Sequence, residues 1–273
     1  MLHTRYDFGD ESPATDLTHR QLRAALADRG GALWVDARAP TDADAAVLAN
    51  SLRLPPPVVA WLCHAAPRPE LPPADALTCL TLADGSGEID IALGPNLVVM
   101  HDRGSHAYGA HLTPPAVHTI PLGIGADGLV AHVVARIASD LDAAVATLGG
   151  SVAQAITDAA RRPGEAGTAL HAVQRRTTGL AETIAADQAA AQTLRAAAQV
   201  HDGARAVIDT ALGVLAEAAA DAQAVAEQAR TATPGPEVLA LAAIARDVAV
   251  IKWLLIVGMA IIALLALRLA VGY

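Results

Sequence analysis

The chain has 273 residues, of which 53% are hydrophobic and 3% aromatic, and its formal net charge is −9 at pH 7. This charge argues against nucleic acid as a partner, because binding phosphates needs a basic surface. The two cysteines, Cys63 and Cys79, offer neither a disulfide framework nor a CxxC metal spacing, which agrees with a reducing compartment.

The first sixteen residues, MLHTRYDFGDESPATD, carry acids and have no apolar central region. They are therefore neither a secretory signal nor a leading transmembrane helix. We expect the bulk of the chain to be cytosolic.

Residues 1–125 contain clustered prolines and short apolar runs. Strands bounded by turn residues are predicted at 31–37, 76–83, 88–94 and 96–102. Between the first two runs, apolar residues at helical spacing follow Thr41 and Asp42, either of which is a suitable N-cap. This part of the sequence predicts a cytosolic α/β domain.

From Asp127 onward the sequence is rich in alanine and helical in pattern, with breaks near 161–165, 201–203 (the weakest) and 231–237. Residues 126–247 are therefore predicted to form a long helical stalk or bundle. Alanine favours helices but buries little apolar surface, so these helices must pack closely or against copies of themselves. We expect a homo-oligomer.

The C-terminal residues predict one transmembrane helix at 248–273. Fifteen consecutive residues, Trp253 to Leu267, have no charged or polar side chain. Crossing the hydrocarbon core takes roughly 20 helical residues, and the long side chains of Lys252 and Arg268 can reach opposite headgroup layers. The fold class predicted overall is an α+β membrane protein with a single C-terminal span. Arg246 and Lys252, which precede the span, favour an N-terminal domain inside the cell.

The segment GIGADG, with Gly123, Gly125 and Gly128, matches the dinucleotide-binding pattern GxGxxG and opens a predicted helix after a possible strand at 118–122. A dinucleotide fold needs a second parallel strand soon afterwards, whereas this helix continues. We therefore expect no nucleotide, with the glycines serving the turn and Asp127 serving as N-cap.

A run of histidines at 101–118 is an alternative candidate for a metal site, together with Asp102. The histidines are His101, His106, His111 and His118. Their spacing fixes no ligand geometry, so solvated histidines in a loop and at a strand end are the favoured interpretation.

Two serines are candidate nucleophiles. Ser86 in DGSGE and Ser105 in RGSHA both lack the nucleophile-elbow pattern. The sequence therefore gives no support for hydrolase chemistry, and we expect that the protein is not an enzyme.

The order of these segments resembles the CorA family of divalent metal-ion transporters, which includes the ZntB branch. Residues 33–56, with Trp34-Val35-Asp36, resemble the opening strand and helix of the family. Residues 88–102 are similar to its strand pair. Further segments with counterparts in the family are 127–148 and 167–184 (two long cytosolic helices), 204–229 (the stalk helix) and Pro67-Arg68-Pro69. Lys252, the only lysine, lies where the family has a lysine before its first transmembrane helix.

The resemblance implies a homo-oligomer, specifically a pentamer, in the inner membrane that transports Mg²⁺, Co²⁺ or Zn²⁺. The family ends its first transmembrane helix in Gly-Met-Asn and continues into a second. Here Gly258-Met259 is followed by Ala260, the chain ends in Ala-Val-Gly-Tyr, and Val248 replaces an asparagine. Trp253 to Leu267 also offers no oxygen ligand to a divalent ion. A non-transporting, tail-anchored oligomeric scaffold, metal sensor or accessory subunit is the alternative function.

The acids of the helical half are expected on solvated faces, from which an oligomeric stalk could bind divalent cations. They are Glu182, Asp187, Asp209, Glu217, Asp221, Glu227 and Asp247. For Mg²⁺ or another divalent cation we single out Asp209 and, in the loop of LADGSGE, Asp84. The regulatory stalk acid of the family falls near Ala206 in this chain.

Overall fold

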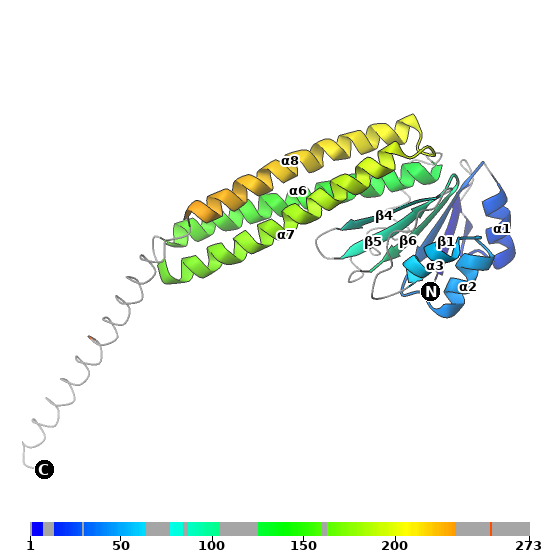
Figure 1. The fold of residues 1–273 in the computed structure, drawn as a ribbon, viewed down its shortest axis with the longest axis horizontal. Helices are drawn as coiled ribbons and strands as arrows, with labels where there is room; N and C mark the ends of the chain where they lie inside the picture. Colours follow the sequence, from blue (N-terminus) through cyan, green and yellow to red (C-terminus); the bar gives the residue numbers. More distant parts are fainter. Residues whose placement is uncertain are drawn as a thin grey trace, which may run out of the picture. The chain divides into compact units, whose positions relative to one another are not determined.

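The computed structural model describes residues 2–7, 14–28, 30–63, 77–83, 87–103, 125–159 and 163–232, together with Lys252. These residues form a mixed α/β portion followed by three long helices (Figure 1). The elements are β1 (Leu2–Asp7), β2 (Ala14–Thr15), α1 (His19–Ala27), β3 (Ala32–Ala37), α2 (Asp42–Asn50), α3 (Pro56–Cys63), β4 (Thr78–Ala83), β5 (Glu88–Leu93), β6 (Leu97–Asp102), α6 (Gly125–Ala159), α7 (Pro163–Ala196) and α8 (Asp202–Ala232).

The strands form one six-stranded sheet in the order β2-β1-β3-β6-β5-β4. The pair β3–β6 is parallel, and the other pairs are antiparallel. Cross-strand partners include Asp36 with Met100 and Asp90 with His101. All four predicted strands are confirmed as β3, β4, β5 and β6.

Local capping explains where two of the short helices begin. Thr41 is the N-cap of α2, and its side chain and that of Asp44 form a capping box. Thr18 and Gln21 do the same for α1. The predicted helix after Thr41 is thus confirmed, whereas α1 and α3 were not predicted.

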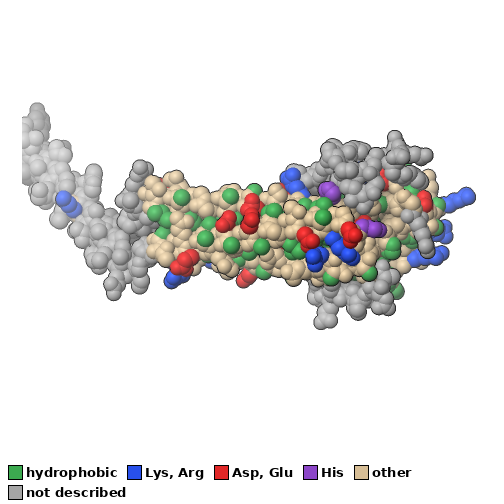
Figure 2. Space-filling view, turned by 90° about the horizontal axis from the view of Figure 1, so that it is seen from above, with side chains coloured by type: hydrophobic (Ala, Val, Ile, Leu, Met, Phe, Trp, Pro, Cys, Tyr) green, Lys and Arg blue, Asp and Glu red, His purple; other side chains and the backbone are tan. Residues whose placement is uncertain are grey.

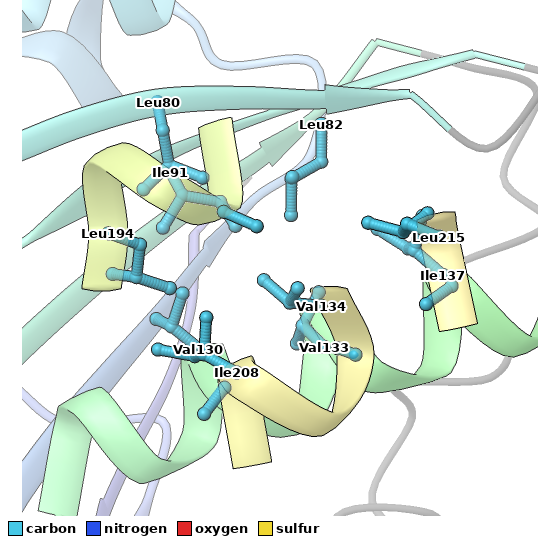
Figure 3. Packing of buried hydrophobic residues seen from close by; sticks show 14 of the residues in the cluster. Leu80, Leu82, Ile91, Val130, Val133, Val134, Ile137, Leu194, Ile208 and Leu215 are labelled. Atoms are coloured by element: carbon cyan, nitrogen blue, oxygen red, sulfur yellow. The ribbon is translucent and has the colours of Figure 1, made fainter. Parts of the chain in front are cut away.

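Two hydrophobic cores cover the two faces of the sheet, because alternate residues of each strand point to opposite sides. The core between the sheet and α1, α2 and α3 contains Leu33, Val35 and Val99 from the strands and Trp61 from α3. We call the core on the other face the helix–sheet core. It joins β4, β5 and β6 to α6, α7 and α8 through residues such as Leu80, Leu82, Ile91, Val130, Val134, Ile137, Leu194, Ile208 and Leu215 (Figure 3).

The described chain divides into two compact units. The first consists of 1–146 and 179–222, and so contains the sheet together with the adjoining parts of the long helices. The second consists of 147–178 and 223–273. Its described hydrophobic core, here called the helical core, contains Val152, Ala155, Leu170, Val173 and Ala229. These units divide each long helix along its length, and the boundary predicted at residue 125 stays a prediction.

The predicted breaks in the helical half agree with the structure where it is described. One lies between the end of α6 at Ala159 and the start of α7 at Pro163. The break at 201–203, predicted as the weakest, separates α7 from α8 as two helices. The third predicted break, at 231–237, lies mostly outside the described residues.

Among the described residues, no helix combines the length and the apolar character needed to cross a bilayer. The span predicted at 248–273 lies outside them, apart from Lys252, which is helical and exposed. Arg268, the other predicted boundary residue, is also outside the described part.

Candidate functional site

A buried ion pair joins the sheet to α3. Asp90 on β5 is completely buried, and its carboxylate accepts a hydrogen bond from Thr81 Oγ1 (2.7 Å) and pairs with the guanidinium of Arg103. Arg103 Nη2 also donates to the carbonyl oxygen of Trp61 at 2.5 Å. Because both charges are withdrawn from water, each depends on the other for compensation. This cluster stabilises the end of β6 against α3.

His101 lies opposite Asp90 in the antiparallel pair β5–β6 and is 7% exposed. Burial lowers its pKa, and the Arg103 guanidinium lowers it further, against the opposing charges of Asp90, Asp102 and Asp36. The expectation of a solvated histidine is therefore wrong for His101, because β6 runs between two covered faces. The other three histidines of the run, at 106, 111 and 118, lie outside the described residues, as do Ser86 and Ser105.

The Trp-x-Asp segment of the resemblance lies on β3. Asp36 is almost buried and accepts a hydrogen bond from Arg38 Nε at 2.7 Å. Trp34 packs against the helix–sheet core. The segment therefore contributes to the packing between the sheet and the long helices.

A second buried carboxylate joins the start of α6 to the residue before α8. Asp127 is 3% exposed, and its Oδ2 accepts the backbone N–H of His201 (2.8 Å) and lies 2.9 Å from His201 Nδ1. The prediction that Asp127 is an N-cap is wrong, because α6 already begins at Gly125 and Asp127 lies in its first turn. Gly125 has φ +76, and a Cβ there would lie 2.9 Å from Asp127 Oδ1, so the glycine serves this turn as predicted.

A third buried carboxylate joins α7 to the end of β4. Asp187 is 1% exposed, and its Oδ1 accepts the backbone N–H of Ala83 at 2.8 Å. The expectation of a solvated position is therefore wrong for Asp187. It is confirmed for Glu182, Asp209, Glu217, Asp221 and Glu227, while Asp247 lies outside the described part.

Gln199 adds an uncharged link between the helices and the same strands. It lies in the connection between α7 and α8, and its Nε2 donates to Thr78 Oγ1 (2.6 Å) and to the carbonyl oxygen of Leu93 (3.1 Å). Together with Asp187, it fixes the long helices to the sheet through specific polar contacts as well as apolar packing.

Of the two predicted cation positions, the structure describes Asp209 but not Asp84. Asp209 on α8 has an exposed side chain that pairs with Arg195 at the end of α7, with 3.4 Å between Arg195 Nη2 and Asp209 Oδ2. Asp84 lies outside the described residues and directly follows Ala83. A divalent cation at Asp209 would therefore compete with a guanidinium.

Within the ranges that the structure describes, no three histidine, cysteine, aspartate or glutamate side chains gather in a way that could hold a metal ion. On the face shown in Figure 2, acidic side chains lie apart from one another along the helices, several beside a basic one. Several of the described exposed charges form ion pairs, among them Arg136–Asp140 and Arg230–Glu227.

Neither a protein-family model nor a curated protein sequence matches this chain. Solved structures do match it. The complete structure of the CorA magnesium transporter from Methanocaldococcus jannaschii is 12% identical, with a TM-score of 0.63 over 94% of this chain and 82% of that chain. The full-length CmaX protein is 17% identical, with a TM-score of 0.63 over 93% and 81%.

A soluble domain also matches at nearly its full length. The cytoplasmic domain of ZntB from Vibrio parahaemolyticus is 12% identical, with a TM-score of 0.54 over 90% of this chain and 95% of that chain. The resemblance in segment order thus extends to the arrangement of the sheet and the long helices. This chain has a CorA-like fold.

Proposed function

We propose that this protein is a CorA-like membrane protein of the divalent metal-ion transporter family, with its N-terminal domain in the cytoplasm and its anchor in the inner membrane. The observation that carries the proposal is the match over 94% of this chain to a complete magnesium transporter. The proposal is also supported by the order of strands β3 to β6 and of the long helices, because the resemblance to the family rests on that order.

Membrane insertion is proposed from the sequence of the C-terminal residues. Trp253 to Leu267 is uniformly apolar, and Lys252 and Arg268 flank it at a spacing suited to the two headgroup layers. We expect the full chain to resist extraction from membranes by alkaline carbonate. A variant with Leu255→Arg and Leu264→Arg should be released, because two charges in the span oppose insertion.

Self-association is proposed from the alanine content of the long helices. Among the described residues of the second compact unit, two of the five in the buried core are alanines, which bury little surface within one chain. We expect the full chain in detergent to be a homo-oligomer by light scattering, and a pentamer if the family assembly applies. A monodisperse monomer would contradict this part of the proposal.

For a divalent cation such as Mg²⁺ we propose Asp84 and Asp209 as binding positions. Asp209 is the more readily tested, because its carboxylate is exposed and its partner Arg195 is known. Asp209→Asn should weaken Mg²⁺ binding in calorimetry on the full chain. Asp221→Asn, an exposed acid further along the same helix, is the matched control and should leave binding unchanged.

A specific observation also favours the second function, a non-transporting scaffold, metal sensor or accessory subunit. Trp253 to Leu267 contains no hydroxyl, amide or carboxylate. Mg²⁺ loses its water reluctantly and needs oxygen ligands or room for the hydrated ion, so an apolar wall opposes its passage.

Flux measurements distinguish the two functions. The full chain is reconstituted in liposomes, its oligomeric state is checked, and uptake of Mg²⁺, Co²⁺ and Zn²⁺ is followed with an ion-sensitive dye. Saturable uptake above that of protein-free liposomes supports transport. An intact oligomer that binds the ions without uptake supports the second function.

A further inference from the structure

Each long helix passes from one hydrophobic core to the other along its length. In α6 the helix–sheet core ends at Val145, and Val152 belongs to the helical core. In α7 the change occurs between Val173 and Ile184, which are buried in the helical and the helix–sheet core. In α8 it follows Ala222, the last buried residue of the helix–sheet core.

Glycines occupy this transition in α6 and α7. Gly150 lies between Val145 and Val152, and Gly179 lies between Val173 and Ile184. Apart from its chain neighbours and the adjacent backbone of its own helix, a Cβ atom added at either glycine would have no described atom within 4 Å, so no close packing there demands a glycine. Both residues nevertheless weaken their helix relative to alanine.

In the same segments, side-chain hydroxyl groups donate hydrogen bonds to backbone carbonyl oxygens of their own helix. Ser151 Oγ donates to the carbonyl oxygen of Thr147 at 3.0 Å, and Thr178 Oγ1 donates to that of Gln174 at 3.0 Å. Beyond the glycine of α7, Thr183 Oγ1 donates to the carbonyl oxygen of Gly179 at 3.1 Å. Such bonds bend helices, and glycine–serine pairs are common sites of kinks.

The polar residue Thr177 adds to the weakness in α7. It is 1% exposed and bonds to its own helix, through Oγ1 and the carbonyl oxygen of Val173 at 2.9 Å. Thr193 and Thr210 make the same kind of bond elsewhere in the helices. The transition segments differ from those places because glycine, hydroxyl bonding and the change of core coincide.

We propose that α6 and α7 are built to bend, at 149–151 and 177–179, in the stretch of each helix between its residues of the helix–sheet core and those of the helical core. Helix α8 crosses from Ala222 to Ala229 without a glycine and acts as the continuous element. This bending is a property of the helices themselves and does not depend on whether the protein transports ions.

Hydrogen exchange on the full chain in detergent, without added metal, tests whether α6 and α7 are less stable next to these glycines. After correction for intrinsic rates, amides at 151–154 and 180–183 should exchange faster than those at 137–141 and 190–194. The double variant Gly150→Ala/Gly179→Ala should slow the faster set about fivefold, which corresponds to the difference in helix propensity between glycine and alanine. The control Gly213→Ala, an exposed glycine of α8 with similar space around it, should leave these amides unchanged. Equal protection of both sets in the unmodified chain would overturn the proposal.

A distance measurement separates bending from local fraying. Spin labels are placed at the exposed positions 139 and 153 of α6, in a Cys63→Ser/Cys79→Ala background and diluted with unlabelled protein. The distance distribution should narrow in the Gly150→Ala/Gly179→Ala variant and stay unchanged in Gly213→Ala. A distribution that is already as narrow in the background protein would overturn the bend.

Discussion

The helix–sheet core and the helical core lie along the same three helices but differ in their side chains. In the helix–sheet core, large aliphatic side chains such as Leu80, Ile91 and Leu141 pack together, and Asp127 and Asp187 add specific hydrogen bonds. In the part of the chain that the structure describes, the helical core has five buried residues, two of them alanine. Since stabilisation grows with the apolar area removed from water, continuity of a helix does not imply uniform stability along it.

The largest loss in the free energy of unfolding should come from breaking the buried ion pair of the sheet. Asp90→Ala leaves the Arg103 guanidinium buried without its carboxylate, so the free energy of unfolding should fall by about 3–5 kcal/mol. Urea denaturation followed by tryptophan fluorescence measures it. The matched control is Asp209→Ala, which removes an exposed ion pair and should shift the midpoint far less. Equal shifts in the two variants would show that burial does not determine how much stability is lost when an ion pair is broken.

Truncating one leucine in each core compares the two directly. Leu141 and Leu170 are both completely buried, the first in the helix–sheet core and the second in the helical core. Leu141→Ala should lower the free energy of unfolding of the sheet by about 2–5 kcal/mol. Leu170→Ala should instead accelerate hydrogen exchange at 170–178 and leave the urea midpoint of the sheet nearly unchanged. If both variants lower that midpoint equally, the two cores unfold as one.

The link between α7 and β4 should contribute less than a core leucine. Asp187→Ala removes the acceptor of the Ala83 N–H in a buried place, at a cost of about 1–3 kcal/mol. Asp187→Asn keeps a carbonyl oxygen and should recover much of the loss in the same urea titration. If asparagine costs as much as alanine, the charge of the carboxylate matters more than its role as acceptor.

The smallest effect is a pH dependence from His101. Burial lowers its pKa in the folded protein below the ordinary value of 6.5, so below that pH the unfolded chain binds a proton that the folded chain resists. Stability from this group is complete above 6.5 and is lost as the pH falls through the folded pKa. His101→Gln should reduce the change in melting temperature between pH 7.5 and pH 5. An unchanged slope in the variant would assign the dependence to other groups.

The sequence predicted the fold best where hydrophobic patterns are strong. The runs at 31–37 and 96–102 correspond to β3 and β6, and the long alanine-rich stretches correspond to helices. It failed at β1, whose residues Thr4 and Arg5 are buried although polar. It also left α3 unpredicted, because clustered prolines usually interrupt helices, whereas proline fits the first turn of a helix.

The long-range hydrogen bonds of the buried aspartates could not be predicted from the sequence, for a different reason. Asp187 bonds to Ala83, 104 residues away, and Asp127 to His201, 74 residues away. Locally, an aspartate in a helix looks the same whether it faces water or a neighbouring strand. Only the three-dimensional packing distinguishes Asp187 from Asp209.

The position of the helix–sheet core has a consequence for biosynthesis. The ribosome completes β6 at Asp102, but one face of the sheet is covered in part by Ile208, Leu215 and other residues of α8, which emerge much later. Until then the nascent chain presents Leu80 and Ile91 to solvent, where exposed apolar surface of this kind binds chaperones or aggregates. A fragment that ends at residue 125 would keep that surface permanently, so expression of the sheet requires the helices as well.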